Sequence, residues 1–197
     1  MTTSIRLVAG LGNVGREYAA TRHNAGFWFA DALAASLGTT FSRDGKFAGD
    51  VARAGALRIV KPSTYMNLSG QSVAALANFH AIAPAEILVV HDELDLQPGE
   101  AKMKLGGGVA GHNGLKDIRA RLGSADFWRL RLGIGHPRDS QFAEQAVVDY
   151  VLRPPPAAER GAIDAAIDAA LGAWPDIAAG DFERAMLVLH TKPKDTK

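Results

Sequence analysis

Ile5-Arg6-Leu7-Val8-Ala9-Gly10-Leu11-Gly12-Asn13-Val14-Gly15 is the stretch that decides the fold of this chain. Its first half is an apolar run that predicts a buried β-strand. Its second half is a glycine-rich turn that places Asn13 shortly after the strand. A strand that leads through such a turn toward a helix is typical of α/β domains, in which strands and helices alternate.

Strand-like and helix-like segments go on alternating after this turn. Strands are predicted at 48–53, 57–61, 87–90, 101–105 and 128–134, and helices at about 24–37, after Asn67 and after Asn113. In the helix at 24–37, Asn24 is the predicted N-cap, and Phe29, Leu33 and Leu37 fall on one face. The segment 87–90 is wholly apolar and stops at the polar run His91-Asp92-Glu93-Leu94-Asp95. After Pro154-Pro155-Pro156 the chain is alanine-rich, which predicts helices up to a polar tail at 192–197.

The composition narrows the possible functions. The chain has 197 residues, enough for one domain with its own core, and it has no cysteine, which excludes disulfides, thiolate nucleophiles and cysteine-ligated zinc. The first residues do not form a signal peptide and no run is long enough to cross a bilayer, so we expect a cytoplasmic protein that does not enter the membrane. The net charge is only +1, but basic residues recur at Lys102, Lys104, Lys116, Arg119, Arg121, Arg129 and Arg131. They are either solvated faces of their elements or a nucleic-acid-binding patch.

The turn at 10–15 also matches the G-x-G-x-x-G pattern of dinucleotide-binding proteins. That pattern requires a helix that opens at once and an acidic residue about 20 positions later, at the end of a strand. Here residues 16–23 precede the helix, and the nearest acidic candidate, Asp31, falls inside it. Dinucleotide binding is therefore the weaker alternative to a tight turn that presents Asn13.

His23 is the strongest candidate for a catalytic group. A hydrolase needs a nucleophile, a base that takes its proton, and donors for the developing oxyanion. The chain has neither a G-x-S-x-G elbow nor a cysteine, which favours water activated by a base. Asp92, after a buried strand, would keep His23 oriented and basic if the two side chains meet; otherwise His23 is a structural or surface residue. His80, His136 and His190 are interpreted as surface or loop residues.

Three asparagines and a glycine-rich segment complete the candidates. Asn13, Asn67 and Asn113 lie at junctions between elements, where an asparagine either forms a turn or donates its amide to a carbonyl. The segment 106–114 is either a mobile surface loop or a lid over a long substrate. The run from His91 to Asp95 raises a metal site as a further alternative, but no paired spacing such as H-E-x-x-H accompanies it, and we expect no metal.

Taken together, these segments resemble bacterial-type peptidyl-tRNA hydrolase over nearly the whole chain. The stretches that carry the resemblance are Gly10-Leu11-Gly12-Asn13, Tyr18, Thr21-Arg22-His23-Asn24-Ala25-Gly26, Tyr65-Met66-Asn67-Leu68-Ser69-Gly70, His91-Asp92-Glu93-Leu94-Asp95-Leu96, Gly106-Gly107-Gly108, Gly111-His112-Asn113-Gly114-Leu115-Lys116 and Arg129-Leu130-Arg131-Leu132-Gly133-Ile134-Gly135-His136-Pro137. No single stretch is decisive, but this set in this order is highly specific.

The resemblance implies an α/β, single-domain, three-layer fold with a central mixed twisted sheet flanked by helices, over residues 1–191. It implies hydrolysis, without a cofactor, of the ester bond between the peptide (or an N-blocked aminoacyl group) and tRNA in peptidyl-tRNA. That reaction recycles tRNA, and the partner would be peptidyl-tRNA itself, held by its acceptor stem, its 3′ end and its peptide. The resemblance further implies a monomer.

The resemblance also implies roles for single residues. His23 would be the general base that activates water, Asp92 would keep it basic and oriented, and Asn13 would distinguish blocked from free α-amino groups. The remaining matched positions would bind substrate: Tyr18, Tyr65, Asn67 and Asn113, with Lys104 and Arg131 on the 5′ phosphate of the tRNA.

Three positions depart from the family's pattern. Val14 stands where the family usually has proline, Val109-Ala110 where it commonly has His-Gly, and Tyr65 where it usually has phenylalanine. None of these changes removes a catalytic group. The alternatives that remain are a non-catalytic RNA-binding protein on the same scaffold and a dinucleotide enzyme.

Overall fold

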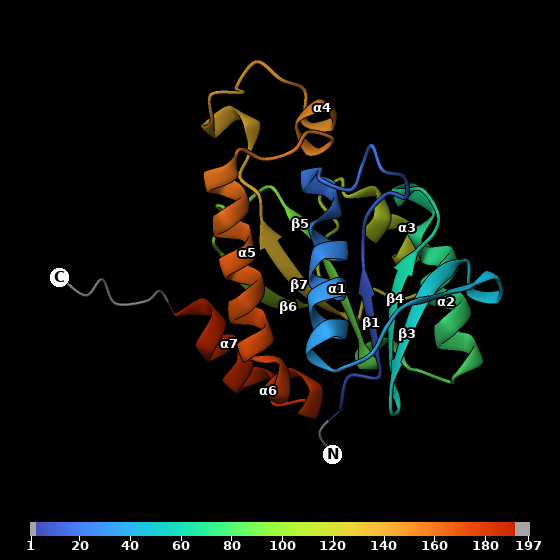
Figure 1. Ribbon diagram of the computed structural model, residues 1–197. Helices are drawn as coiled ribbons and strands as arrows, with labels where there is room; N and C mark the ends of the chain where they lie inside the picture. The colour runs from blue at the N-terminus through green and yellow to red at the C-terminus, as the bar shows by residue number, and fades with distance from the viewer. Residues whose placement is uncertain (1–2, 192–197) are drawn as a thin grey trace.

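A seven-stranded mixed sheet forms the centre of the computed structural model, which describes residues 3–191. The strands stand in the order β2-β3-β4-β1-β5-β7-β6. Their bounds are β1 Leu7–Gly10, β2 Ser42–Asp44, β3 Gly49–Ala54, β4 Leu57–Pro62, β5 Ile87–Glu93, β6 Ala101–Leu105 and β7 Trp128–Gly133. β4, β1, β5 and β7 are parallel, whereas β2, β3 and β6 pair in the antiparallel sense. In Figure 1, β1 runs upward from the N-terminus, so the carboxyl ends of the parallel strands meet at the upper edge of the sheet.

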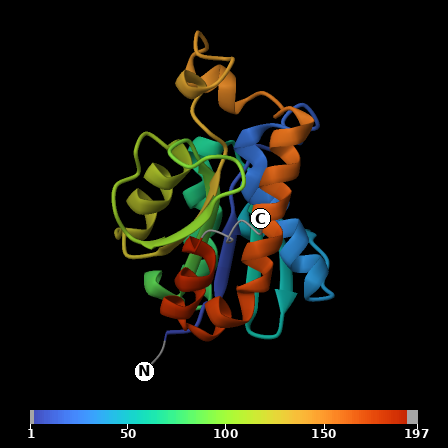
Figure 2. The same ribbon diagram turned by 90° about the vertical axis from the view of Figure 1, so that its left-hand side faces the viewer.

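Helices cover both faces of this sheet (Figures 1 and 2). The α-helices are α1 Ala25–Ser36, α2 Ser69–Phe79, α3 Asn113–Leu122, α4 Val147–Val151, α5 Ala157–Gly172, α6 Trp174–Ala179 and α7 Phe182–His190. The short 3-10 helices are η1 Arg22–Asn24, η2 Gly45–Phe47, η3 Met66–Leu68, η4 Pro84–Glu86 and η5 Pro137–Asp139. α1 and α5 pack on one face, α2 and α3 on the other, and α7 lies against the edge strand β6. The predicted three-layer fold with a mixed sheet is confirmed.

Alternating side chains of the central strands build two apolar cores. Val8 and Leu88 belong to the core beneath α1 and α5. Leu7 and Val89 belong to the core beneath α2 and α3. A strand covered on both faces is apolar at every position, which is why these segments are continuous apolar runs. Burial of each such leucine or valine stabilises the fold by about 1.5–3 kcal/mol, so the strand ends form a firm base for a site.

Several elements differ from the prediction in their bounds. β5 runs on to Glu93, so His91 and Asp92 lie within the strand and not after it. α1 begins at Ala25, and the side chain of Asn24, predicted to cap it, makes no capping hydrogen bond. β2 was not predicted because its three residues are all polar. Leu37, predicted on the same face of the first helix as Phe29 and Leu33, is 37% exposed, whereas those two are buried.

The last quarter of the chain is helical, as predicted, but it is divided into α4, α5, α6 and α7. None of the helices within residues 3–191 combines the length and the apolar character that crossing a membrane requires. The predicted polar tail at 192–197 lies outside the described residues.

Candidate functional site

A cleft of about 970 Å³ opens at the carboxyl ends of the parallel strands, with α4 on one side and β6 and β7 on the other. Ligand sites of open α/β sheets lie at this edge. The predicted site residues that line the cleft are Asn13, His23, Tyr65, Asn67, Asp92, Lys104, Asn113 and Arg131. Tyr18 is half-buried in the turn after Gly15 and is not among the described residues that line the cleft.

His23 and Asp92 meet at the floor of the cleft. His23 lies on η1, and its Nδ1 is 2.9 Å from Oδ1 and 3.0 Å from Oδ2 of Asp92. The Asp92 side chain is only 3% exposed, whereas that of His23 is 15% exposed. Because a carboxylate can only accept, Nδ1 carries the proton of the neutral ring and Nε2 keeps its lone pair. The contact therefore leaves Nε2 as the ring nitrogen of His23 that is able to accept a proton.

The electrostatics of the pair keep Asp92 ionised and His23 basic. Burial alone would lower the pKa of His23, but the charge of Asp92 and its hydrogen bond outweigh burial and raise that pKa above 6.5. Burial would raise the pKa of Asp92, yet the charge of His23 and the hydrogen bond from His112 hold that pKa well below its usual range. The neighbouring His91 is buried, which lowers its pKa to about 3 and keeps it neutral.

Two asparagines fix the turn that follows β1. The backbone N–H of Asn13 donates to Oδ1 of Asn24 at 2.8 Å, and Nδ2 of Asn24 donates to the carbonyl of Asn13 at 2.9 Å. Oδ1 of Asn13 in turn accepts the N–H of Met66 at 2.7 Å. The amide Nδ2 is thus the part of the Asn13 side chain that remains for a ligand.

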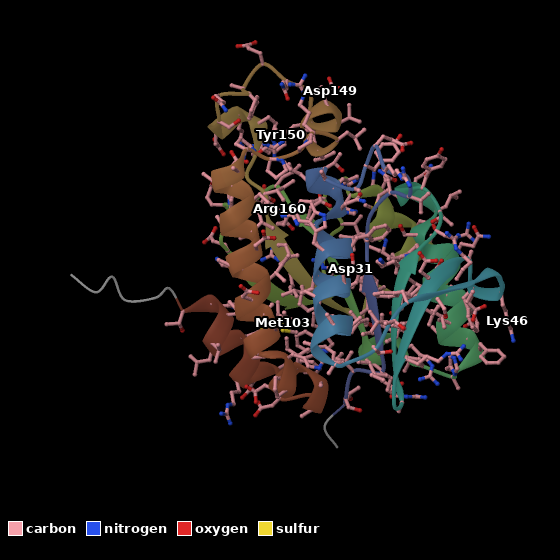
Figure 3. All side chains as sticks on the ribbon, in the orientation of Figure 1. Asp31, Lys46, Met103, Asp149, Tyr150 and Arg160 are labelled. Atoms are coloured by element: carbon pink, nitrogen blue, oxygen red, sulfur yellow. The ribbon has the colours of Figure 1, made fainter. Side chains whose placement is uncertain are left out.

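Close packing and a buried arginine hold His23 in place. A side chain on Gly26 would collide with the backbone of Leu11 and Val90, so glycine lets the start of α1 sit against the strand ends. Arg22, which is 1% exposed, donates to the carbonyl of Tyr150 at 3.1 Å and to Glu159 at 3.1 Å. Its guanidinium also lies 3.9 Å from the centre of the ring of Tyr150, a residue labelled in Figure 3. Arg22 therefore ties the segment next to His23 to α4 and α5.

A second histidine contacts the same carboxylate. Nε2 of His112 lies 3.1 Å from Oδ1 of Asp92. His112 is also the N-cap of α3, where its Nδ1 accepts the N–H of Leu115 at 3.4 Å. The sequence analysis did not consider His112. Its position in the sequence, directly before a predicted helix and three residues before the N–H group that it caps, could have identified it as a helix cap.

The same three side chains raise the question of a metal. Ligand atoms of His23, Asp92 and His112 all lie within 4.8 Å of one another. A nitrogen that binds a metal must be unprotonated. While Nδ1 of His112 accepts the Leu115 N–H, the neutral ring carries its proton on Nε2, which is then unable to bind a metal. The arrangement therefore favours a hydrogen-bonded cluster over a metal centre.

The glycine-rich segment forms one wall of the cleft between β6 and α3. Gly106, Gly107 and Gly111 have positive φ, and so does Ala110, at φ 44°. A residue with a Cβ is strained there by about 1–2 kcal/mol. Val109 is buried in the core beneath α2 and α3, and its carbonyl accepts the N–H of His112 at 2.8 Å. Of the two residues that depart from the family's pattern, Val109 thus anchors the loop at its centre and Ala110 is exposed; the role of the loop as a lid stays a prediction.

The end of the cleft at β6 and β7 is basic. Lys104 is paired with Arg129 across the two strands, and Arg131 is on the same face two residues further along β7. Arg129 donates to the carbonyl of Gly108 at 2.9 Å. Burial and the neighbouring charge of Arg131 lower the pKa of Arg129, and Glu93 offsets this only in part. Three cations thus lie together at this end of the cleft, and Arg129, which the sequence analysis listed only among the basic residues, lies between the other two in the pairing of the strands.

The opposite wall is apolar. α4 and the residue after it present Val147, Val148, Val151 and Leu152, with Leu94 from the loop after β5. Val148 is 60% exposed although it is aliphatic. The sequence analysis assigned no role to this segment, because a short helix with three valines carries no catalytic residue type. The cleft thus runs from a basic end, past His23, to an apolar end.

Comparisons with known proteins agree with this geometry. The sequence profile of the family described as peptidyl-tRNA hydrolase matches residues 7–197. A peptidyl-tRNA hydrolase of Thiobacillus denitrificans is 54% identical over 192 residues, which cover 98% of this chain and 93% of that protein. One of Neisseria gonorrhoeae is 56% identical over 196 residues, covering 98% and 100%. The crystal structure of peptidyl-tRNA hydrolase from Acinetobacter baumannii superposes with a TM-score of 0.89 at 45% identity and covers 96% of each chain.

Proposed function

The chain belongs to the peptidyl-tRNA hydrolase family, and from this premise we propose how its cleft carries out the reaction. The protein is an enzyme that hydrolyses peptidyl-tRNA. The bond broken is the ester between the peptide and the tRNA, and the products are a peptide with a free carboxylate and a reusable tRNA. Water must therefore be activated next to an ester carbonyl, and a polyanion and a peptide must be held at the same time.

His23 activates the water. Its Nε2 lone pair takes a proton as the water oxygen attacks the ester carbonyl, and the imidazolium that forms is stabilised by Asp92. Asp92 stays ionised throughout and fixes the ring in the tautomer that has its lone pair on Nε2. The contact of 2.9 Å between His23 and Asp92 is the observation that carries this proposal. The protonated ring then returns its proton to the leaving ribose oxygen.

Amides around His23 position the substrate. Nδ2 of Asn13 is left to donate to a carbonyl of the peptide, because its Oδ1 is taken by Met66. Asn67 and Asn113 both line the cleft, on η3 and at the start of α3, two elements that pack against each other. Their amides are placed to hold the ester carbonyl and the attacking water, and Tyr65, 61% exposed at the rim, offers its ring for stacking.

The two ends of the cleft separate the two halves of the substrate. Lys104 and Arg131, together with Arg129, bind the 5′ phosphate of the tRNA at the basic end. The peptide lies toward the apolar wall of α4. Tyr18 contributes from the turn beside the cleft. The domain spans residues 1–191 and acts as a monomer in the cytoplasm. It needs no cofactor, because His23, Asp92 and the amides supply every group that the reaction requires.

Release of tRNA from N-blocked aminoacyl-tRNA in the presence of a chelator tests this function. We expect the wild-type enzyme to cleave at the same rate with and without chelator, since no step uses a metal. Added nucleotide cofactor should not shift the thermal unfolding midpoint. A folded wild-type protein that binds tRNA but releases none from the ester would instead support a non-catalytic RNA-binding protein.

Replacing Lys104 by glutamine is expected to weaken substrate binding and leave kcat nearly unchanged. The substitution removes one phosphate contact, so the slope of log KM against log salt concentration should fall by roughly 0.7–0.9. The measurement is KM for N-blocked aminoacyl-tRNA with and without its 5′ phosphate, over a range of salt concentrations. Removal of the phosphate should raise KM for the wild type but hardly at all for the variant.

Lys46→Gln is the matched control for this substitution. Lys46 lies on η2, at the right of Figure 3, with its Nζ 3.5 Å from the centre of the Phe79 ring. It is not among the described residues that line the cleft. Both variants lose one positive charge, so any effect of net charge alone appears in both. If Lys104→Gln responds to the 5′ phosphate as the wild type does, the assignment of Lys104 to that phosphate is wrong.

A further inference from the structure

His112 makes two hydrogen bonds that together fix where its proton lies. Its Nδ1 accepts from the backbone N–H of Leu115, a group that can only donate. A neutral imidazole carries one proton, so that proton must be on Nε2. Nε2 lies 3.1 Å from Oδ1 of Asp92, and the carboxylate can only accept. His112 is therefore a neutral donor to the same oxygen atom that accepts from His23.

From this geometry we infer that His112 is a positioning residue for the reaction, one that holds the Asp92 carboxylate through Nε2–H and thereby sets the orientation and the strength of the base His23. The inference rests on the proposed role of His23 as the general base. Oδ1 of Asp92 receives two donors, His23 at 2.9 Å and His112 at 3.1 Å. Both hydrogen bonds are made to the same carboxylate. The bond from His112 therefore weakens the electrostatic stabilisation that Asp92 gives to a protonated His23.

Two further histidines and the Asp92 carboxylate pack around the ring of His112. From η1 comes His23, with ring centroids 5.2 Å apart, and from β5 come Asp92 and His91, the latter edge-on at 5.0 Å. His91 donates Nδ1–H to the carbonyl of Asp92 at 2.7 Å, and its buried Nε2 has no partner among the described residues. Arg129 adds a positive charge that also acts on His91. His23 and His91, which flank the ring of His112, thus also contact Asp92 themselves.

The position of His112 in the chain also links two parts of the site. It caps α3, the helix that begins with Asn113, and its backbone N–H donates to the carbonyl of Val109 at 2.8 Å. The side chain is only 10% exposed. One rigid ring thus connects the end of the glycine-rich segment, the start of α3 and the catalytic carboxylate, so Asp92 and Asn113 keep a fixed relation.

His112→Asn and His112→Gln separate the two hydrogen bonds. Asparagine is a good N-cap and keeps an acceptor for the Leu115 N–H, but it is too short to reach Asp92. Glutamine is longer and its amide can donate to Asp92, but it gives up the cap. Thermal unfolding of both variants shows whether they are folded, and rates of tRNA release are then measured as a function of pH.

We expect His112→Asn to lower the plateau value of kcat about tenfold, with a much smaller change in KM, because Asp92 is no longer held in one orientation. The midpoint of the pH profile should move to higher pH, because the whole charge of Asp92 then acts on His23. His112→Gln should recover most of the lost plateau rate and return the midpoint toward that of the wild type, although it is less stable.

Two outcomes overturn the inference. A His112→Asn enzyme with the plateau and midpoint of the wild type would show that the donor to Asp92 has no role. Equal losses in His112→Asn and His112→Gln, with an unmoved midpoint, would show that the ring serves only to support structure or substrate. A wild-type profile without any ionisation near that of His23 is a different failure, that of the general base itself.

Discussion

Replacing His23 by alanine is expected to lower kcat by roughly 100- to 10,000-fold. Without the imidazole, the water loses the base that the proposed mechanism uses to take its proton. Asp92 would remain, but it is buried and ionised, and its low pKa makes it a poor base near neutral pH. The rate that remains would come from the amides and from substrate binding, which do not depend on His23.

Binding should survive this substitution. The basic end of the cleft is formed by β6 and β7, away from η1, so KM or the dissociation constant for tRNA should change little. The measurement is single-turnover release of tRNA from N-blocked aminoacyl-tRNA, with tRNA affinity determined in parallel. His80→Ala is the matched control, because His80 ends α2 and does not line the cleft. Turnover near the wild-type value in a folded His23→Ala enzyme would refute the assignment of the base.

Replacing Asp92 by asparagine is expected to lower kcat roughly 100-fold or more. An amide has one acceptor oxygen and one donor nitrogen. The oxygen can still accept from His23, but the nitrogen can also turn toward Nδ1, and the ring then carries its proton on Nε2, where it cannot act as a base. The fixed tautomer is lost in a fraction of the molecules.

The same substitution should move the pH profile to lower pH. In the wild type the charge and hydrogen bond of Asp92 raise the pKa of His23 against the effect of burial. In Asp92→Asn the burial remains and the charge is gone, so the pKa of His23 falls below its ordinary value. The midpoint of the rate therefore moves down, opposite in sign to the shift expected for His112→Asn. An Asp92→Asn enzyme with full activity and an unmoved midpoint would show that the pair is not catalytic.

The central strands could be predicted from the sequence because a strand buried on both faces consists of consecutive apolar residues. The segment 87–90 was found in this way, and its continuation to Glu93 was missed because His91 and Asp92 are polar. A buried strand tolerates them only because each finds partners: Asp92 bonds His23 and His112, and His91 bonds a backbone carbonyl. Those partners are far apart in the chain, so no local pattern reveals them.

The functional residues show the same limit. The contact between His23 and Asp92 joins residues 69 positions apart, and the sequence could only state what would follow if they met. Asn24 looked like a helix cap from its neighbours, yet its amide instead holds Asn13, 11 positions earlier. Arg22 was overlooked because an arginine is ordinarily exposed, and its burial is explained only by carbonyls and a carboxylate from α4, α5 and the turn between them.

The most direct test of the account is the pH dependence of single-turnover tRNA release by the wild-type enzyme, from about pH 5 to about pH 9 with chelator present. A neutral His23 is required, so the rate should rise about tenfold per pH unit at low pH and then level off. Since the pKa of His23 is raised, the midpoint should lie above 6.5, and the chelator should leave the curve unchanged. A rate that is independent of pH across this range, or one that the chelator abolishes, would contradict hydrolysis by a metal-free histidine base.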